Sequence, residues 1–229
     1  MIKAFILLQK RDDLGLAEFS RHWYHVHGPL ALRLKTLRRY IQSHLIEREI
    51  PEFDTGDTCH GIAEVWMDSL ADAQNIPSDP DYLEGLYRDE PNFLVRERTQ
   101  YLFTREHSII EPPVLEPEND GFVKSIYLTK KRPDLDLEEF QQHWLNIHAP
   151  LVHGTPGLLG YTQAHVIADT YKEMEPAFDG VAELWWPDID TFLAAWNSAE
   201  HQEKQLEDLE NFIDMKATRG MLVLPRYLL

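Results

Sequence analysis

The sequence is poor in cysteine and in positive charge, and both shortages exclude classes of protein. Cys59 is the single cysteine among 229 residues, so no disulfide can form within the chain. Lysine and arginine together number 22 against 39 acidic residues, which gives a formal net charge of -17. Long-range electrostatics therefore oppose binding to nucleic acid or to an anionic lipid surface, and we expect neither as a partner.

Long apolar runs are missing as well. No stretch approaches the ~20 consecutive apolar residues that a membrane-spanning helix needs. The apolar segment IKAFILL at residues 2–8 does not indicate a secretion signal, because its counterpart VKSIYLT lies at residues 123–129, in the middle of the chain. We therefore expect a cytoplasmic protein that makes no contact with a membrane.

Several common enzyme motifs are also absent. The sequence has no glycine-rich phosphate loop, no G-x-S-x-G nucleophile elbow and no Cys-based nucleophile motif. These absences argue against nucleotide-dependent transfer and against standard covalent hydrolysis.

What the chain does contain is an internal repeat. IKAFILLQKRDDLGLAEF (2–19) matches VKSIYLTKKRPDLDLEEF (123–140) at an offset of 121 residues, and GIAEVW (61–66) matches GVAELW (180–185) at an offset of 119. Residues 109–121, rich in proline and acidic side chains, predict an extended linker. We predict two similar domains, one over residues 1–108 and one over residues 122–229.

Hydrophobic periodicity predicts the element order β-α-β-β-α-β in each half, which is a ferredoxin-like arrangement. In the first half we expect strands at residues 2–9, 38–47, 60–67 and 101–108. An amphipathic helix begins near Leu16 and kinks or restarts at Pro29. A second helix follows the third strand and is interrupted between Pro77 and Pro80.

In the second strand of each half, successive side chains point to two faces of different character. One face is small or apolar, and we expect it to pack under the helices. The other face is aromatic and polar, and we expect the two copies to face each other across a barrel interior that holds one small ligand. The polar face comprises Tyr40, Gln42 and His44 in the first half and Tyr161, Gln163 and His165 in the second.

The histidine-rich segments HWYHVHGP (22–29) and HWLNIHAP (143–150) raise the question of a metal site. Only residues three or four apart share a face of an α-helix, so His27 could not join His22 and His25 on one ion. The second copy also has Asn146 in place of His25. We therefore expect no metal at these histidines.

Together these motifs resemble the EthD-like family of dimeric α+β barrels. The resemblance rests on F-x-x-H-W-x-x-x-H-x-P, Y-x-Q-x-H, a third strand that bears a glutamate, and D-E-x-N-F (89–93) or D-L-E-N-F (208–212). It implies an α+β fold in which two ferredoxin-like repeats form an intramolecular version of the dimeric barrel. Isomerases of this superfamily line their pocket with a helix-one histidine and a strand-two tyrosine, which match His27 with Tyr40 and His148 with Tyr161.

The residues favour proton-transfer chemistry, because imidazole and phenol can move protons without a cofactor. We predict that His27 is a general acid or base and that Tyr40 binds the developing oxyanion, with His44 as a third member. His148, Tyr161 and His165 would form a corresponding second cavity. The predicted substrate-binding residues are Gln42, Gln163, Glu64, Glu183, Arg33 and Arg39. In this scheme the glutamates orient His44 and His165, and the two arginines attract an anionic substrate.

Each of these groups also has a structural alternative. The histidines could cap helix ends, the tyrosines could fill a barrel, the glutamates could face water, and the arginines could belong to a solvated helix end.

The leading functional hypothesis is a cofactor-independent isomerase, lyase or dehydratase. Its substrate would be a small aromatic-derived or ring-cleavage metabolite such as a dienoate, a lactone or a polyketide-like phenol. The alternatives are a haem-binding or oxygen-using barrel enzyme, with His201 as a candidate haem ligand, and a non-catalytic binding protein. Two tandem chains could also associate as a homodimer.

Overall fold

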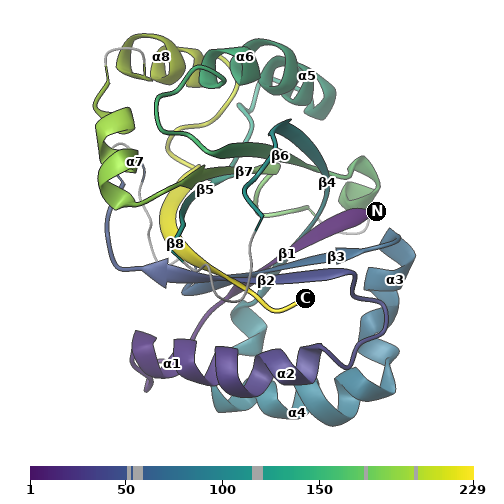
Figure 1. Cartoon of the computed structure of the whole chain (residues 1–229). Helices are drawn as coiled ribbons and strands as arrows, with labels where there is room; N and C mark the ends of the chain where they lie inside the picture. The colour runs from purple at the N-terminus through teal and green to yellow at the C-terminus, as the bar shows by residue number, and fades with distance from the viewer. Residues whose placement is uncertain (51–52, 54–58, 115–120, 173–174, 199–200) are drawn as a thin grey trace.

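Eight strands within the described residues close into one antiparallel barrel in a computed structural model (Figure 1). The structure describes residues 1–50, 53, 59–114, 121–172, 175–198 and 201–229. Around the barrel the order is β1-β3-β2-β8-β5-β7-β6-β4. The strands are β1 (Ile2–Leu8), β2 (Arg39–Ile46), β3 (Gly61–Met67), β4 (Gln100–Ile110), β5 (Val123–Thr129), β6 (Gly160–Val166), β7 (Gly180–Trp186) and β8 (Arg219–Tyr227).

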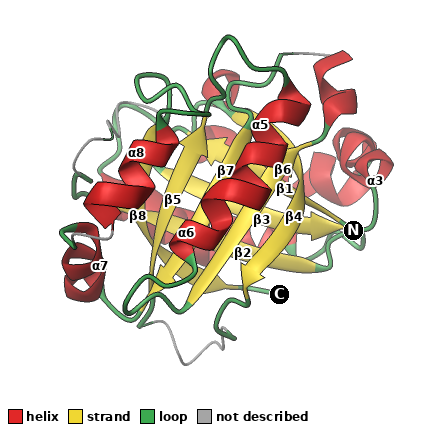
Figure 2. Cartoon of the chain, turned by 90° about the horizontal axis from the view of Figure 1, so that it is seen from above, coloured by secondary structure: helices red, strands yellow, loops and turns green. Residues whose placement is uncertain are grey.

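The helices form two layers on opposite sides of the barrel, one from each half (Figures 1 and 2). Those of the first half are α1 (Leu16–His22), the π-helix η1 (Trp23–His27), α2 (Gly28–Ala31), α3 (Leu70–Asn75), η2 (Ile76–Ser78), the π-helix η3 (Tyr82–Leu86), α4 (Tyr87–Asp89), η4 (Glu90–Asn92) and η5 (Arg96–Arg98). Those of the second half are α5 (Leu137–His143), the π-helix η6 (Trp144–His148), α6 (Ala149–Val152), η7 (Ala168–Lys172), α7 (Ile189–Trp196), the π-helix η8 (His201–Gln205) and α8 (Leu206–Leu209).

The last strand of each half closes the barrel by pairing with the other half. β4 pairs with β1 of its own half and with β6 across the first seam, and β8 pairs with β5 and with β2 across the second. The predicted intramolecular barrel is therefore confirmed. β4 continues to Ile110, two residues into the segment that was predicted to be a linker.

The two faces of the second strand are oriented opposite to the prediction. Tyr40 lies opposite Val65 in the ladder and packs under the helices against Trp23, whereas Ile41 lies opposite Glu64 and points into the barrel. The prediction was wrong because alternation separates two faces without saying which one meets the helices. The helix supplies hydrogen-bonding partners to the tyrosine, so the polar face is satisfied there.

The barrel interior is packed with apolar side chains, among them Phe5, Leu7, Ile62, Leu102, Ile126 and Leu128. The predicted ligand cavity inside the barrel is therefore also wrong. The two cavities that hold the candidate site residues lie instead between each helical layer and the sheet.

Four buried charges from both halves meet inside the barrel. Lys3 pairs with Glu64, at 3.0 Å, and with Glu183 of the other half, while Lys124 pairs with Glu183, at 2.7 Å, and with Glu64. Burial alone would lower the pKa of Lys3, but the neighbouring carboxylates, led by Glu183, outweigh burial and raise it well above its usual range. The two ion pairs that join the halves hold the repeats to each other inside the barrel.

Candidate active site

A cavity of about 300 Å³ lies between the helices and the sheet of the first half. Its floor is the face of β1 and β3 that carries Ala4, Ala63 and Val65, and its remaining wall is mostly apolar. The polar side chains that reach it include His27, Tyr40, Tyr82, Glu90, Arg96 and Tyr101. Its size falls at the lower end of the range for small-molecule pockets.

His27 forms a dyad with an aspartate on the second helical segment of its half. Its Nδ1 atom lies 3.0 Å from Oδ2 of Asp89, and the two side chains are 12% and 9% exposed. When Nδ1 carries the hydrogen and donates it to the carboxylate, Nε2 of neutral His27 is left as an acceptor. His148 and Asp208 form the same dyad in the second half, at 2.9 Å.

His22 binds the other oxygen of the same carboxylate, with its Nε2 atom 2.9 Å from Asp89 Oδ1. The expectation that His22 and His27 do not share a helix face is wrong, because η1 is a π-helix and its wider turn brings residues five apart to nearly the same side. Burial raises the pKa of Asp89, but hydrogen bonds from His27, Asn92 and His22 lower it to about 2. The carboxylate is therefore charged at neutral pH.

Tyr40 is held in a buried network that sets the direction of its hydroxyl group. Its oxygen accepts hydrogen bonds from Trp23 Nε1, at 3.2 Å, and from Gln42 Nε2, at 2.9 Å. Both bonds use the phenol oxygen as the acceptor, so its own hydrogen is left to be donated elsewhere. Burial raises the pKa of Tyr40 to about 12, which keeps the phenol protonated.

His44 does not belong to the residues that line the cavity. Its Nε2 atom lies 3.1 Å from Gln42 Oε1, its Nδ1 atom lies 2.5 Å from Ser20 Oγ, and its ring packs on Trp23. Burial lowers the pKa of His44 to about 3. Its counterpart His165 bonds in the same way to Gln163 Oε1, at 3.1 Å, and its pKa is also lowered to about 3 by burial.

The glutamates and arginines that were predicted to bind substrate do not line the cavity. Glu64 and Glu183 point into the barrel and bind lysines, so they cannot orient His44 or His165 on the opposite face of the sheet. Arg33 is exposed on the surface. The guanidinium of Arg39 lies 4.7 Å from the ring centroid of Trp66 at an end of the barrel. Neither arginine lines the cavity.

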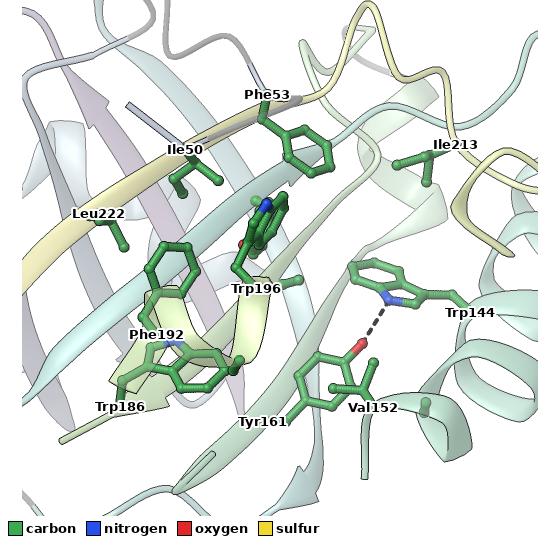
Figure 3. Close-up of a cluster of buried hydrophobic side chains, with 14 of the residues drawn as sticks. Ile50, Phe53, Trp144, Val152, Tyr161, Trp186, Phe192, Trp196, Ile213 and Leu222 are labelled. Carbon is green, nitrogen blue, oxygen red and sulfur yellow. Dashed lines mark hydrogen bonds between the residues drawn. The ribbon is translucent and has the colours of Figure 1, made fainter. Parts of the chain in front are cut away.

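The equivalent space in the second half is about 60 Å³, because larger side chains fill it (Figure 3). At the repeat offset of 119 residues, Phe192 replaces Ala73 and Trp196 replaces Pro77. Phe53, from the first half, adds its ring 5.9 Å from that of Trp196. His148 and Tyr161 therefore keep their hydrogen bonds but face little open space.

Sequence reasoning missed Asp89, Glu90 and Arg96 as site residues. Asp89 and Glu90 open the D-E-x-N-F segment, and the aspartate recurs at the same place as Asp208. That recurrence was the available signal for the dyad. Arg96 has Met215 as its counterpart, so comparing the two copies would have marked it as specific to the first half.

The model of the EthD domain matches the chain twice, at residues 11–97 and 132–216, which is more than half of its length. The chain belongs to the EthD family. Each match includes one histidine–aspartate dyad of this EthD protein. No curated protein is similar enough in sequence to be matched as a relative.

Solved structures with the same fold cover nearly all of this EthD chain. An anthrone oxidase-like protein has a TM-score of 0.64 at 8% identity, over 99% of this chain and 93% of its own. A Fusobacterium nucleatum protein, provisionally assigned as a monooxygenase, has a TM-score of 0.62 at 10% identity, over 100% of this chain and 92% of its own. A variant chlorite dismutase of Candidatus Nitrospira defluvii has a TM-score of 0.54 at 13% identity, over 97% of this chain and 90% of its own. At these identities the similarity shows the fold alone.

Two general properties of the EthD chain complete the description. In the described parts of the chain, no group of three or more histidine, cysteine or acidic side chains is arranged to hold a metal ion. Of the helices in those same parts, none is long and apolar enough to cross a membrane.

Proposed function

We propose that the first-half cavity is the active site of a cofactor-independent acid/base enzyme, an isomerase, lyase or dehydratase. Its substrate would be a small aromatic-derived or ring-cleavage metabolite such as a dienoate, a lactone or a polyketide-like phenol. The observation that carries this proposal is the dyad of His27 and Asp89, whose histidine lines a largely apolar cavity.

The dyad gives His27 the properties of a general base. Asp89 accepts the hydrogen of Nδ1 and would stabilise the imidazolium that forms when Nε2 takes a proton from a substrate carbon or hydroxyl group. The same proton can return to a neighbouring atom or to a leaving hydroxyl group, so the enzyme ends the cycle unchanged. Tyr40, whose hydrogen is available, would donate to the oxyanion that develops on the substrate.

The second half would not take part in turnover. His148 and Asp208 form an equivalent dyad, but the space beside them is filled by Phe192, Trp196 and Phe53. We therefore assign its dyad a structural role, which is to tie η6 to α8.

The test is a panel of dienoates, lactones and phenolic compounds, assayed for conversion and for exchange of carbon-bound hydrogen with deuterated water. His27→Gln and Asp89→Asn should lower the rate by about 100- to 10,000-fold, the usual contribution of a general acid or base. His148→Gln and Asp208→Asn are the matched controls and should retain the wild-type rate. His22→Ala is unsuitable as a neutral control, because His22 shares Asp89 with His27. Full activity of His27→Gln would refute the assignment.

A second candidate is an oxygen-using enzyme, which is favoured by the similarity in fold to an anthrone oxidase-like protein. Proton abstraction by His27 from an activated ring carbon would also be a reasonable first step of such an oxidation. Oxygen consumption during turnover separates the two candidates. Haem does not fit the second half, because the space there is about 60 Å³, and the side chain of the candidate ligand His201 lies outside the described residues.

A further inference from the structure

We infer that the first-half cavity selects uncharged ring compounds that carry hydroxyl or carbonyl oxygens, and that it discriminates against carboxylates. This inference rests on the proposed function, since it specifies the ligand of the same site. It favours lactones and phenols over dienoates and replaces the predicted attraction of an anionic substrate.

The first reason is that the arginine in the cavity wall is already neutralised. Arg96 donates from Nε to Oε2 of Glu90 at 2.5 Å, and the two side chains are 28% and 11% exposed. Tyr82 donates to the other carboxylate oxygen at 3.2 Å. The guanidinium also lies 3.7 Å from the ring centroid of Tyr87. A ligand therefore meets an ion pair fixed in place instead of an uncompensated positive charge.

A positive charge on His27 is also neutralised within the protein. A proton taken up by His27 is compensated by Asp89, whose carboxylate lies 3.0 Å away. Among the described residues that line the cavity, His27, Glu90 and Arg96 are the only ones that carry imidazole, carboxylate or guanidinium groups. A carboxylate that entered would thus be buried without a counter-ion, which is costly in an apolar site.

No attraction from further away offsets that cost. Arg33 and Arg39 do not line the cavity, and the chain as a whole carries a net charge of -17. The long-range field therefore repels anions.

The wall does offer hydrogen-bond donors to a neutral ligand. Burial and the nearby Glu90 raise the pKa of Tyr101, and burial raises that of Tyr40, so both phenols remain protonated at neutral pH. Thr99 Oγ1 is buried and has no hydrogen-bond partner among the described residues. These hydroxyl groups suit the oxygen atoms of a phenol, a ketone or a lactone.

The test uses 2-naphthamide and 2-naphthoate, which have similar shapes and differ in charge. Isothermal titration calorimetry at neutral pH should show that the wild-type chain binds the amide at least about tenfold more tightly, equivalent to about 1.4 kcal/mol. Ala73→Phe, which copies Phe192 of the second half, should abolish binding of both probes.

Two variants then isolate the charge effect. Glu90→Gln leaves Arg96 uncompensated and should shift the preference by at least about tenfold toward 2-naphthoate. Arg98→Met, which removes an exposed arginine paired with Asp12 outside the cavity, should leave the preference unchanged.

Equal or tighter binding of 2-naphthoate by the wild-type chain would overturn the inference. So would an unchanged preference in Glu90→Gln, or binding of either probe that survives Ala73→Phe. Failure of both probes to bind the wild-type chain would overturn it as well. These experiments measure binding and not turnover. Their failure can therefore be distinguished from failure of the proposed function, which is tested by the turnover of His27→Gln.

Discussion

Reciprocal substitutions at one matching helix position should have different effects on the stability of the chain in the two halves. Phe192 is 1% exposed and packs its ring 5.6 Å from that of Trp186 and 5.7 Å from that of Trp196. Phe192→Ala removes a fully buried ring, and such a change costs about 3–5 kcal/mol. In a chain of this size each kcal/mol lowers Tm by about 2–4 °C, so we expect a loss of roughly 6–20 °C.

Ala73 occupies the matching position beside the cavity of about 300 Å³. Ala73→Phe places a ring into existing space, and burying such a side chain is worth about 1.5–3 kcal/mol. We therefore expect an unchanged or higher Tm. Differential scanning fluorimetry of the two variants beside the wild-type chain measures both shifts. If Ala73→Phe lowers Tm as much as Phe192→Ala does, the asymmetry between the two cavities is refuted.

Three further predictions concern buried charges and close packing. Between about pH 6.5 and pH 3, His44 and His165 should be protonated in the unfolded chain but neutral in the folded chain. The free energy of unfolding should therefore fall as pH falls through that window. Urea midpoints at pH 6.5 and pH 4.5 should therefore differ less in the His44→Gln, His165→Gln variant, and an undiminished difference would contradict the pKa assignments. Lys124→Met leaves the buried carboxylates of Glu64 and Glu183 with Lys3 as their shared amine partner and should cost about 3–5 kcal/mol in urea denaturation, whereas a loss below about 1 kcal/mol would show that the cluster is solvated. Gly61→Ala should cost about 1–3 kcal/mol and alter tryptophan fluorescence, because the added carbon would lie 2.4 Å from the ring of Trp23, and an unchanged spectrum and stability would argue against this contact.

The strands and the barrel could be predicted from the sequence because the chain contains each pattern twice. Alternation within residues 38–47 and 60–67 predicted strands that the structure places at Arg39–Ile46 and Gly61–Met67. The repeat then implied two equivalent sheets in one chain. Local periodicity and duplication are properties of the sequence itself, so these inferences needed no information about packing.

The site was harder to predict because its geometry depends on distant residues. The α-helical spacing of 3.6 residues separates His22 from His27, but the π-helical turn brings both to Asp89, 67 and 62 positions further along the chain. The difference in cavity size depends on side chains such as Phe192, and on Phe53 reaching across from the other half. The alternation of residues within one strand does not indicate such contacts between distant residues.

Closure of the barrel by the final strand also constrains how the chain can fold during synthesis. The edge of β2 is complete only when β8 pairs with it, and 172 residues separate Ile46 from Arg219. At about 5–20 residues per second, the ribosome leaves that edge unpaired for roughly 10–35 s. Exposed strand edges of this kind are templates for aggregation, and long-range pairing slows folding. A ribosome-bound first half therefore exposes the edge of β2 until β8 has been synthesised.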